Sequence, residues 1–313
     1  MHQAHEHLNP STLERLEHLP QVALRQLDSI CRQIDRAMSP NQSTNIAKAN
    51  IYWLILYGSA THPSNWDENS SDLNILCVHH DNTTSTALLD RLHLALKELS
   101  PLWSVHFTIM SRRELEESTD VFPLRYLDMQ RHHVMLHGPE DAIAALSISW
   151  AHLRLQLEQR LRSLAMHLTH ILPQLHAHPE LFQELLDRQL GMFWPCLSTL
   201  LFLQDPDWWI AARQALITQS AARLEGVSGE VLNDLLALRQ RRLHPTSAAQ
   251  VHEIASGLYQ SLNHMIQLAN DLADPHDLSS ASGDAPEEGH GAPRDAAELV
   301  QQTRGDEEEE EAS

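Results

Sequence analysis

Two apolar runs joined by a glycine turn place the strongest constraint on how this chain folds. The first, residues 51–59, ends in a Gly-Ser pair, and the second, residues 71–78, carries Asp72 and Asn74 among leucines and isoleucines. Short apolar runs bounded by turn residues predict two neighbouring strands, the first of them buried on both faces. Because side chains two apart on a strand point the same way, Asp72 and Asn74 are expected to project together beside the turn.

The turn itself has a composition that suits phosphate. Gly58 and Ser59 end the first run, and a glycine turn that opens a helix leaves free backbone N–H groups that favour phosphate. The neighbouring carboxylate of Asp72 invites a divalent cation that bridges to the phosphate. The two runs therefore predict a site at which a phosphate and a metal ion meet.

This pattern resembles the nucleotidyltransferase superfamily, the polymerase-β-like fold, and within it the small bacterial members. The resemblance covers residues 45–145. The motifs that carry it are Gly58-Ser59, Ser71-Asp72-Leu73-Asn74, Val105–Met110, Phe122-Pro123-Leu124, Leu127-Asp128-Met129 and His137-Gly138-Pro139-Glu140-Asp141. The resemblance implies an α+β domain, a mixed sheet with flanking helices, that binds a nucleoside triphosphate with Mg²⁺ or Mn²⁺. It also implies that Gly58, Ser59 and Ser71 contact the nucleotide and that Asp72 holds the metal.

The chain departs from this family at the metal-binding positions. Family members that transfer nucleotides use three carboxylates to hold two metal ions. Asp72 matches the first carboxylate, whereas Asn74 and His106 stand at the second and third positions. Mg²⁺ prefers charged oxygen ligands, and an amide offers one neutral oxygen, so metal binding is expected to be weak and the two-metal mechanism impaired. A single metal held by Asp72, the nucleotide phosphates and water remains compatible with this set.

Two functions of different class follow, and the sequence leaves both open. In the first, the protein is an enzyme that moves an NMP group from a nucleoside triphosphate to an unidentified acceptor, with Asp72, Asn74 and His106 as catalytic residues. In the second, it is a pseudoenzyme that serves as a nucleotide sensor or a protein-interaction scaffold, with an antitoxin-like or regulatory role. Asp67 or Glu68, in the loop after the turn, is an alternative metal ligand, although solvated loop carboxylates are far commoner.

Two other motifs are not expected to form sites. His132, His133 and His137 are the densest internal group of histidines, but a strand would place His132 and His133 on opposite faces, which does not suit zinc. Arg239 and His244 fit an Arg-x4–6-His pattern that resembles the ribonuclease motif of HEPN domains. The chain has 22 histidines and all but two of its 22 basic residues are arginine, so chance alone gives several such matches.

Beyond residue 145 the chain changes character. Leucines at heptad-like spacing, interrupted by breaks that contain proline or glycine, predict about five helices in an antiparallel bundle. We therefore expect an N-terminal helix and linker at residues 1–44, a nucleotidyltransferase-like domain at 45–145, an all-α helical bundle at 146–273 and a disordered acidic tail at 274–313.

Composition narrows the classes of partner. The 313 residues carry a net charge of −20, and residues 271–313 alone hold 14 acidic and 2 basic residues. The remainder is acidic as well, which disfavours a broad contact with nucleic acid. Three widely separated cysteines, no signal-peptide pattern and no long apolar run predict a cytoplasmic protein with reduced thiols and no membrane segment. A protein partner is compatible with the sequence, and no motif specifies the acceptor, the nucleotide base or the oligomeric state.

Overall fold

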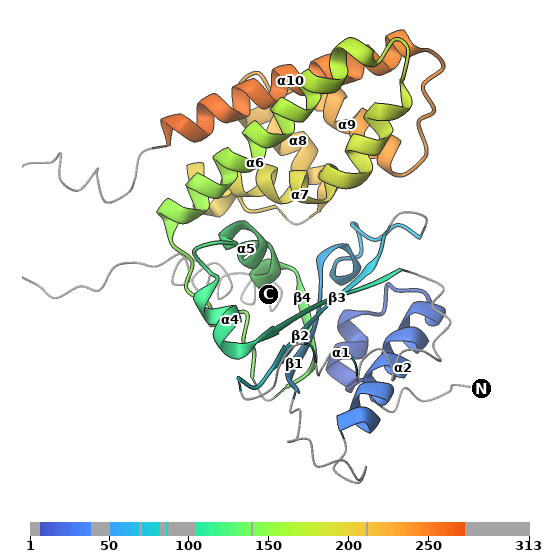
Figure 1. The fold of residues 1–313 in the computed structure, drawn as a ribbon, viewed down its shortest axis with the longest axis vertical. Coiled ribbons are helices and arrows are strands. Elements are labelled where there is room, and N and C mark those ends of the chain that lie inside the picture. The colour runs from blue at the N-terminus through green and yellow to red at the C-terminus, as the bar shows by residue number, and fades with distance from the viewer. Residues whose placement is uncertain are drawn as a thin grey trace, which may run out of the picture. The chain divides into compact units, whose positions relative to one another are not determined.

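The computed structural model shows a chain of the predicted α+β class (Figure 1). It describes residues 7–38, 51–68, 71–81, 86, 90, 104–138, 140–210 and 212–272. Four strands form one mixed sheet, and five long helices follow it in the chain. The acidic tail predicted at residues 274–313 lies outside the described residues.

The sheet confirms that the two apolar runs form neighbouring strands. Its strands are β1 (Ile51–Tyr57), β2 (Leu73–His79), β3 (Val105–Ser111) and β4 (His133–His137), in the spatial order β3-β2-β1-β4. β1 pairs antiparallel with both β2 and β4, whereas β2 and β3 run parallel. Leu54, Ile55 and Leu56 are buried, so the middle strand β1 is covered on both faces, as its continuous apolar sequence predicts.

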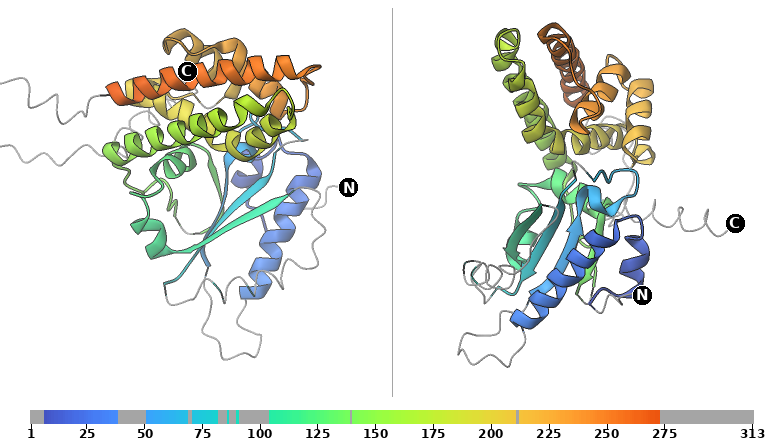
Figure 2. Two further views of the ribbon diagram at one scale, coloured as in Figure 1. Left: turned by 45° about the horizontal axis from the view of Figure 1, so that its top comes forward. Right: turned by 90° about the vertical axis from the view of Figure 1, so that its right-hand side faces the viewer.

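Helix α2 covers one face of this sheet (Figure 2). Leu27 and Ile30 of this helix belong to the same buried cluster as Leu54 and Leu56 of β1 and Ile75 of β2. The alternate residues of β1 that face α2 therefore build the core of the first unit.

Residues 10–38 form two helices and not the single helix that their apolar spacing predicts. α1 spans Pro10–Arg15 and α2 spans Gln21–Met38. The break precedes Pro20, which has no N–H to continue the helix and disfavours a helical conformation in the residue before it. The predicted capping box at Ser11 is also wrong, because Asn9 caps α1 by accepting the Thr12 backbone N–H at 2.7 Å.

Two shorter helices connect β3 to β4. α4 (Arg112–Glu117) begins at Ser111, whose side chain and backbone exchange two hydrogen bonds with Glu114 in a capping box, as the sequence predicts. α5 (Pro123–Arg131) leads directly into β4. The chain thereby places residues 132 and 133 next to the end of β1.

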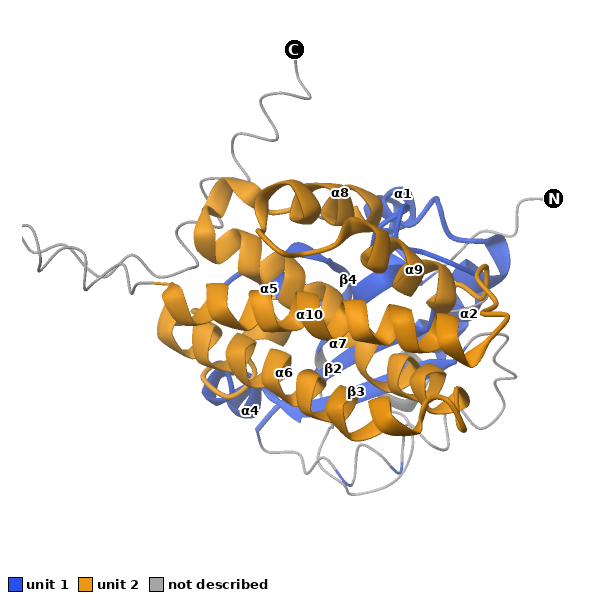
Figure 3. Cartoon of the chain, turned by 90° about the horizontal axis from the view of Figure 1, so that it is seen from above, with its two compact units in different colours: residues 1–119, 128–146 blue, residues 120–127, 147–313 orange. Residues whose placement is uncertain are grey.

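The chain divides into two compact units, residues 1–119 with 128–146 and residues 120–127 with 147–313 (Figure 3). The second unit is built from α6 (Trp150–Ile171), α7 (Glu180–Gln204), α8 (Arg213–Arg223), α9 (Gly229–Arg239) and α10 (Ala248–Asp271), with 3-10 turns η2 (Leu172–Gln174) and η3 (Pro206–Trp208). The helices end at the predicted proline and glycine breaks, and the long helices α6 and α10 lie side by side (Figure 1). Within the described residues, no helix combines the length and apolar content needed to cross a bilayer.

Candidate functional site

The candidate site lies where β1 ends and β2 and β3 begin. Tyr57 pairs with Asn74 across the first ladder, and Asn74 pairs with His106 across the second. Asp72 stands just before β2, and its Oδ2 is 3.7 Å from Nε2 of His106. At that distance the two groups attract each other as an ion pair when the imidazole is protonated, but they form no direct hydrogen bond. The fold therefore brings the three predicted residues Asp72, Asn74 and His106 together.

The glycine turn lies beside the row formed by Asp72, Asn74 and His106. Gly58 has φ +81°, a left-handed conformation that residues with a side chain adopt only with strain. The side-chain nitrogen of Asn74 lies 3.6 Å from where a Cβ of Gly58 would be, so the amide of β2 is next to the turn. Gly58 opens the 3-10 turn η1 (Gly58–Thr61), but its own N–H donates to the His132 carbonyl at 3.2 Å. One of the expected phosphate donors is thus occupied, and the Ser59 amide is the next donor along the turn.

The predicted residues Ser59 and Ser71 hold each other. The Ser59 hydroxyl donates to Oγ of Ser71 at 3.2 Å. Oγ of Ser71 also accepts the Asp67 backbone N–H at 3.0 Å, and the Ser71 N–H donates to the Asp67 carbonyl at 2.8 Å. Ser71 is buried and Ser59 is half-buried, so Ser71 fixes the loop that follows the turn, and Ser59 is the more accessible of the two serines.

The donor set fits one hard cation and not two. Asp72 is the one carboxylate of the row, with Asn74 and His106 supplying a neutral oxygen and an imidazole. Mg²⁺ takes oxygen ligands and keeps several waters, so a single ion on Asp72 can complete its shell from phosphates and water. Across the part of the chain that the structure describes, no three His, Cys, Asp or Glu side chains converge as a metal site. Of the alternative ligands, Asp67 is buried and Glu68 is exposed.

The comparisons with known proteins find a likeness among solved structures. No protein family profile matches the chain, and a search of curated proteins finds no match. Among solved structures, the chain is similar to the crystal structure of spectinomycin adenyltransferase AAD(9) from Enterococcus faecialis with ATP and spectinomycin. The two are 11% identical with a TM-score of 0.47, over 79% of this chain and 99% of that chain. We therefore base the function on the residues of this chain.

Tyr57 is a site residue that the sequence did not single out. Its hydroxyl lies 3.2 Å from Oγ1 of Thr108, and either group can donate. Because Tyr57 is on β1 and Thr108 is on β3, the phenol must cross β2, the strand between them. The ring therefore lies over β2 next to Asn74. In the sequence, this tyrosine looks like the last apolar residue of a buried strand.

Three histidines from different segments also gather at the turn. His18 lies in the loop between α1 and α2, and its Nε2 is 3.2 Å from the Ala60 carbonyl oxygen. His62 directly follows η1, and its ring stands edge-on to that of His132, with 6.0 Å between ring centroids. His132 also has its Nδ1 3.3 Å from Oδ1 of Asp128. We call His18, His62 and His132 the turn histidines.

The surroundings of His18 and His62 lower the pKa of both side chains. Burial lowers the pKa of His62 below its usual value, and the nearby His132 and His18 lower it further. Burial also lowers the pKa of His18, although its hydrogen bond to Ala60 and the charge of Glu17 act in the opposite direction. Both imidazoles are therefore expected to be neutral near pH 7 when nothing is bound.

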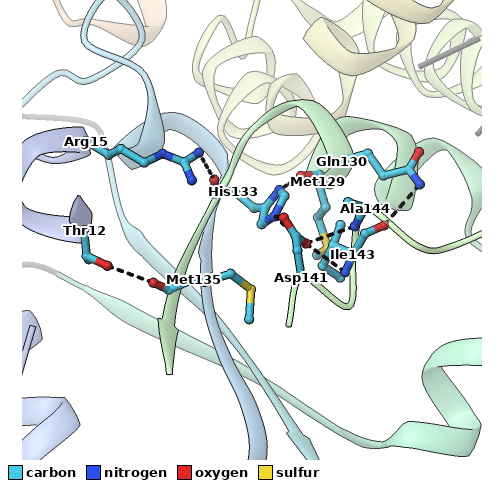
Figure 4. A network of polar contacts seen from close by, with 9 residues as sticks. All are labelled: Thr12, Arg15, Met129, Gln130, His133, Met135, Asp141, Ile143 and Ala144. Atoms are coloured by element: carbon cyan, nitrogen blue, oxygen red, sulfur yellow. Dashed lines mark hydrogen bonds and ion pairs between the residues drawn. The ribbon is translucent and has the colours of Figure 1, made fainter. Parts of the chain in front are cut away.

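The histidines at residues 132–137 lie in different surroundings, since His137 is exposed whereas His132 and His133 have partners within the first unit. His133 is buried, with Nδ1 2.7 Å from the Met129 carbonyl oxygen and Nε2 2.8 Å from Oδ2 of Asp141 (Figure 4). Oδ1 of Asp141 in turn accepts the backbone N–H groups of Ile143 at 3.2 Å and Ala144 at 3.0 Å. His133 thus ties the start of β4 to α5 and to the loop that follows.

Helix α1 covers the outer edge of β4. The Thr12 hydroxyl donates to the Met135 carbonyl at 3.0 Å, and the Arg15 guanidinium donates to the His133 carbonyl at 2.6 Å (Figure 4). These bonds satisfy carbonyls of an edge strand that would otherwise be open to pairing. A cavity of about 500 Å³ next to this edge is lined by His7, Asn9, Met135, Leu136, His137 and Gly138, and it contains none of the predicted site residues.

Arg112 and Arg113 lie at the other end of β3 from the site. They follow Ser111, which pairs with His79 at the end of β2, whereas His106 pairs with Asn74 at its start. Arg112 pairs with Glu116 at 2.8 Å, and Arg113 pairs with Glu117 at 2.7 Å. The Arg112 guanidinium also lies over the Trp53 ring, 5.4 Å from its centroid. Both arginines are therefore helix-surface residues.

Proposed function

We propose that this chain is a nucleotidyltransferase-like protein that binds a nucleoside triphosphate with one divalent cation at the Gly58–Thr61 turn. The observation that carries the proposal is the juxtaposition of this turn with Asp72, Asn74 and His106 at the ends of adjacent strands. The resemblance described from the sequence assigns the same positions to phosphate and metal. Here Ser59 would contact the phosphates, and Asp72 would hold Mg²⁺ or Mn²⁺.

The chemistry that such a site performs is transfer of an NMP group. An acceptor hydroxyl or side chain forms a bond to the α-phosphorus, the bond to pyrophosphate breaks, and the acceptor loses its proton. A bound divalent cation neutralises charge on the phosphates. Asp72 would hold this cation next to the phosphates, and Asn74 and Tyr57 lie beside Asp72. Because only one of the three positions is a carboxylate, we propose that transfer is slow.

The weak donor set also supports a second candidate of another class. With a single carboxylate among Asp72, Asn74 and His106, the same site would bind a nucleotide without turnover and act as a sensor or as an interaction scaffold. The two candidates share the binding step and differ only in the chemical step. Binding and turnover therefore have to be measured separately.

Calorimetric titration tests the binding step. The full chain is titrated with ATP, GTP, CTP and UTP, each with Mg²⁺, with Mn²⁺ and with EDTA. We expect binding of at least one nucleotide that depends on the cation and is lost in Asp72→Ala. The matched control is Asp271→Ala, at the exposed end of α10 in the other unit, which should bind as the wild type does. Absence of binding at millimolar concentrations of all four nucleotides would refute the proposal.

Restoring the carboxylates tests the chemical step. Pyrophosphate release from the nucleotide that binds is followed for wild type and for the double substitution Asn74→Asp with His106→Asp. A gain of metal-dependent release in the double variant would indicate a catalytic site that lacks only its carboxylates. Release already present in the wild type would support the enzyme, and no release in either would support the sensor or scaffold.

A further inference from the structure

The turn histidines surround the same turn that we assign to the phosphates. The His18 ring contacts the Ala60 carbonyl, the His132 carbonyl accepts the Gly58 N–H, and His62 directly follows the turn. They come from the loop between α1 and α2, from η1 and from the start of β4, so three separate segments bring an imidazole to one place. A cluster of this kind has a chemical consequence when an anion binds next to it.

A bound triphosphate needs compensating positive charge. Among the described arginines, Arg112 and Arg113 lie at the far end of β3 from the site and pair with glutamates of α4, and the Arg15 guanidinium donates to the His133 carbonyl. The chain as a whole is strongly acidic. Imidazoles that are neutral in the empty site can supply the charge by taking up protons, because a neighbouring anion favours the protonated form.

We propose that His18 and His62 form the proton-accepting wall of the phosphate site, with the His132 ring packed edge-on against His62, so that a nucleoside triphosphate binds together with one proton or more. This inference rests on the proposed function, because it takes the glycine turn as the place where phosphates bind. Glu17 is adjacent to His18, and Asp128 contacts His132. Nδ1 of His62 accepts the Ser64 backbone N–H at 3.3 Å and lies 2.9 Å from the Ser64 hydroxyl, so proton uptake at this nitrogen replaces the bond from the Ser64 N–H.

Proton uptake makes the affinity depend on pH with a defined sign. The empty site binds few protons near pH 7 and the occupied site binds more, so lowering the pH strengthens binding. For each proton taken up, the Kd increases by up to about tenfold when the pH rises by one unit. His62→Gln keeps a polar side chain of similar size but cannot take up a proton, and it should flatten this dependence.

The experiment is calorimetric titration of the full chain with ATP and Mg²⁺ at pH 6.5 and 7.5. At each pH, two buffers with different ionisation enthalpies are used, because the difference in observed heat counts the protons taken up per ATP. For the wild type we expect net uptake and a several-fold weaker Kd at pH 7.5. For His62→Gln we expect both effects to fall. The matched control is His176→Gln, since His176 stacks on His252 in the other unit and should leave both effects unchanged.

The outcomes separate this inference from the proposed function. Absence of ATP binding at both pH values overturns the proposed function and this inference with it. Binding of ATP with equal proton uptake in wild type and His62→Gln overturns this inference alone and leaves the nucleotide site standing. If His62→Gln fails to fold by circular dichroism, His18→Gln, in the loop before α2, is tested against the same two outcomes.

Discussion

The buried contact between His133 and Asp141 gives a sharp test of the fold around the site (Figure 4). Only 1% of the His133 side chain is exposed, and both ring nitrogens face oxygen acceptors, a carbonyl on one side and a carboxylate on the other. Nδ1 must carry a hydrogen to donate to the carbonyl, and Nε2 and the Asp141 carboxyl group then share one hydrogen between them. Because Asp141 also accepts two backbone N–H groups, it is the natural negative partner.

The cost of breaking this contact can be estimated from its parts. A hydrogen bond to a charged group contributes about 1.5–3 kcal/mol, and removing one partner of a fully buried ion pair costs about 3–5 kcal/mol. Asp141 is 31% exposed, which places this pair below the fully buried case. We expect His133→Gln to lower the free energy of unfolding by about 2–4 kcal/mol. Asp141→Asn should cost about 1–2 kcal/mol, because its amide oxygen can still accept the two backbone N–H groups.

A double-mutant cycle measured by urea unfolding at pH 7, followed by circular dichroism, checks this reasoning. The double variant should cost about 1–2 kcal/mol less than the sum of the single variants, because each substitution removes the same interaction. His170→Gln, on the exposed face of α6, is the matched control and should change stability little. A coupling energy below about 0.5 kcal/mol would refute a direct interaction between the two side chains, since distant and independent sites give values of that size.

Three further substitutions test local features of the helical unit. Arg241 has φ +54° just after α9. In urea titrations, the free energy of unfolding of Arg241→Gly should therefore exceed that of Arg241→Ala by about 1 kcal/mol. Equal stability would contradict backbone strain at this residue. Gly226 has φ +77°, and an added Cβ would lie 2.3 Å from the His264 ring; Gly226→Ala should therefore lower the melting temperature, and Gly226→Ala with His264→Ala should recover part of the loss. Burial and two neighbouring glutamates raise the pKa of Asp234 above its usual value of 3.8, so its charge disfavours the folded state, increasingly as pH rises through that value. Asp234→Asn should stabilise the protein in thermal melts at pH 7 and lose this advantage below about pH 3.5, and a gap independent of pH would contradict the assignment.

Much of the fold follows from local sequence because the deciding forces are local. The apolar run of β1 ends at a glycine, and only glycine readily adopts the conformation found at Gly58. Ser111 and Glu114 form the predicted capping box from residues three apart. The errors have local causes of another kind: Pro20 divides a stretch with uninterrupted helical spacing, and Asn9 outcompetes Ser11 as the cap of α1. In both cases a single residue that controls backbone hydrogen bonds overrides the local sequence pattern.

Some residues of the candidate site could be predicted from the sequence and others could not. Asp72, Asn74 and His106 could be placed from sequence because strand register carries them. His18, His62 and His132 could not, since their proximity depends on how α1, η1 and β4 pack and on no spacing in the chain. The charge of the site depends on both groups. The strand residues supply a single fixed carboxylate, and the turn histidines add positive charge only when protonated. Substitution of His62 therefore separates the fixed charge of the site from the charge that a ligand induces.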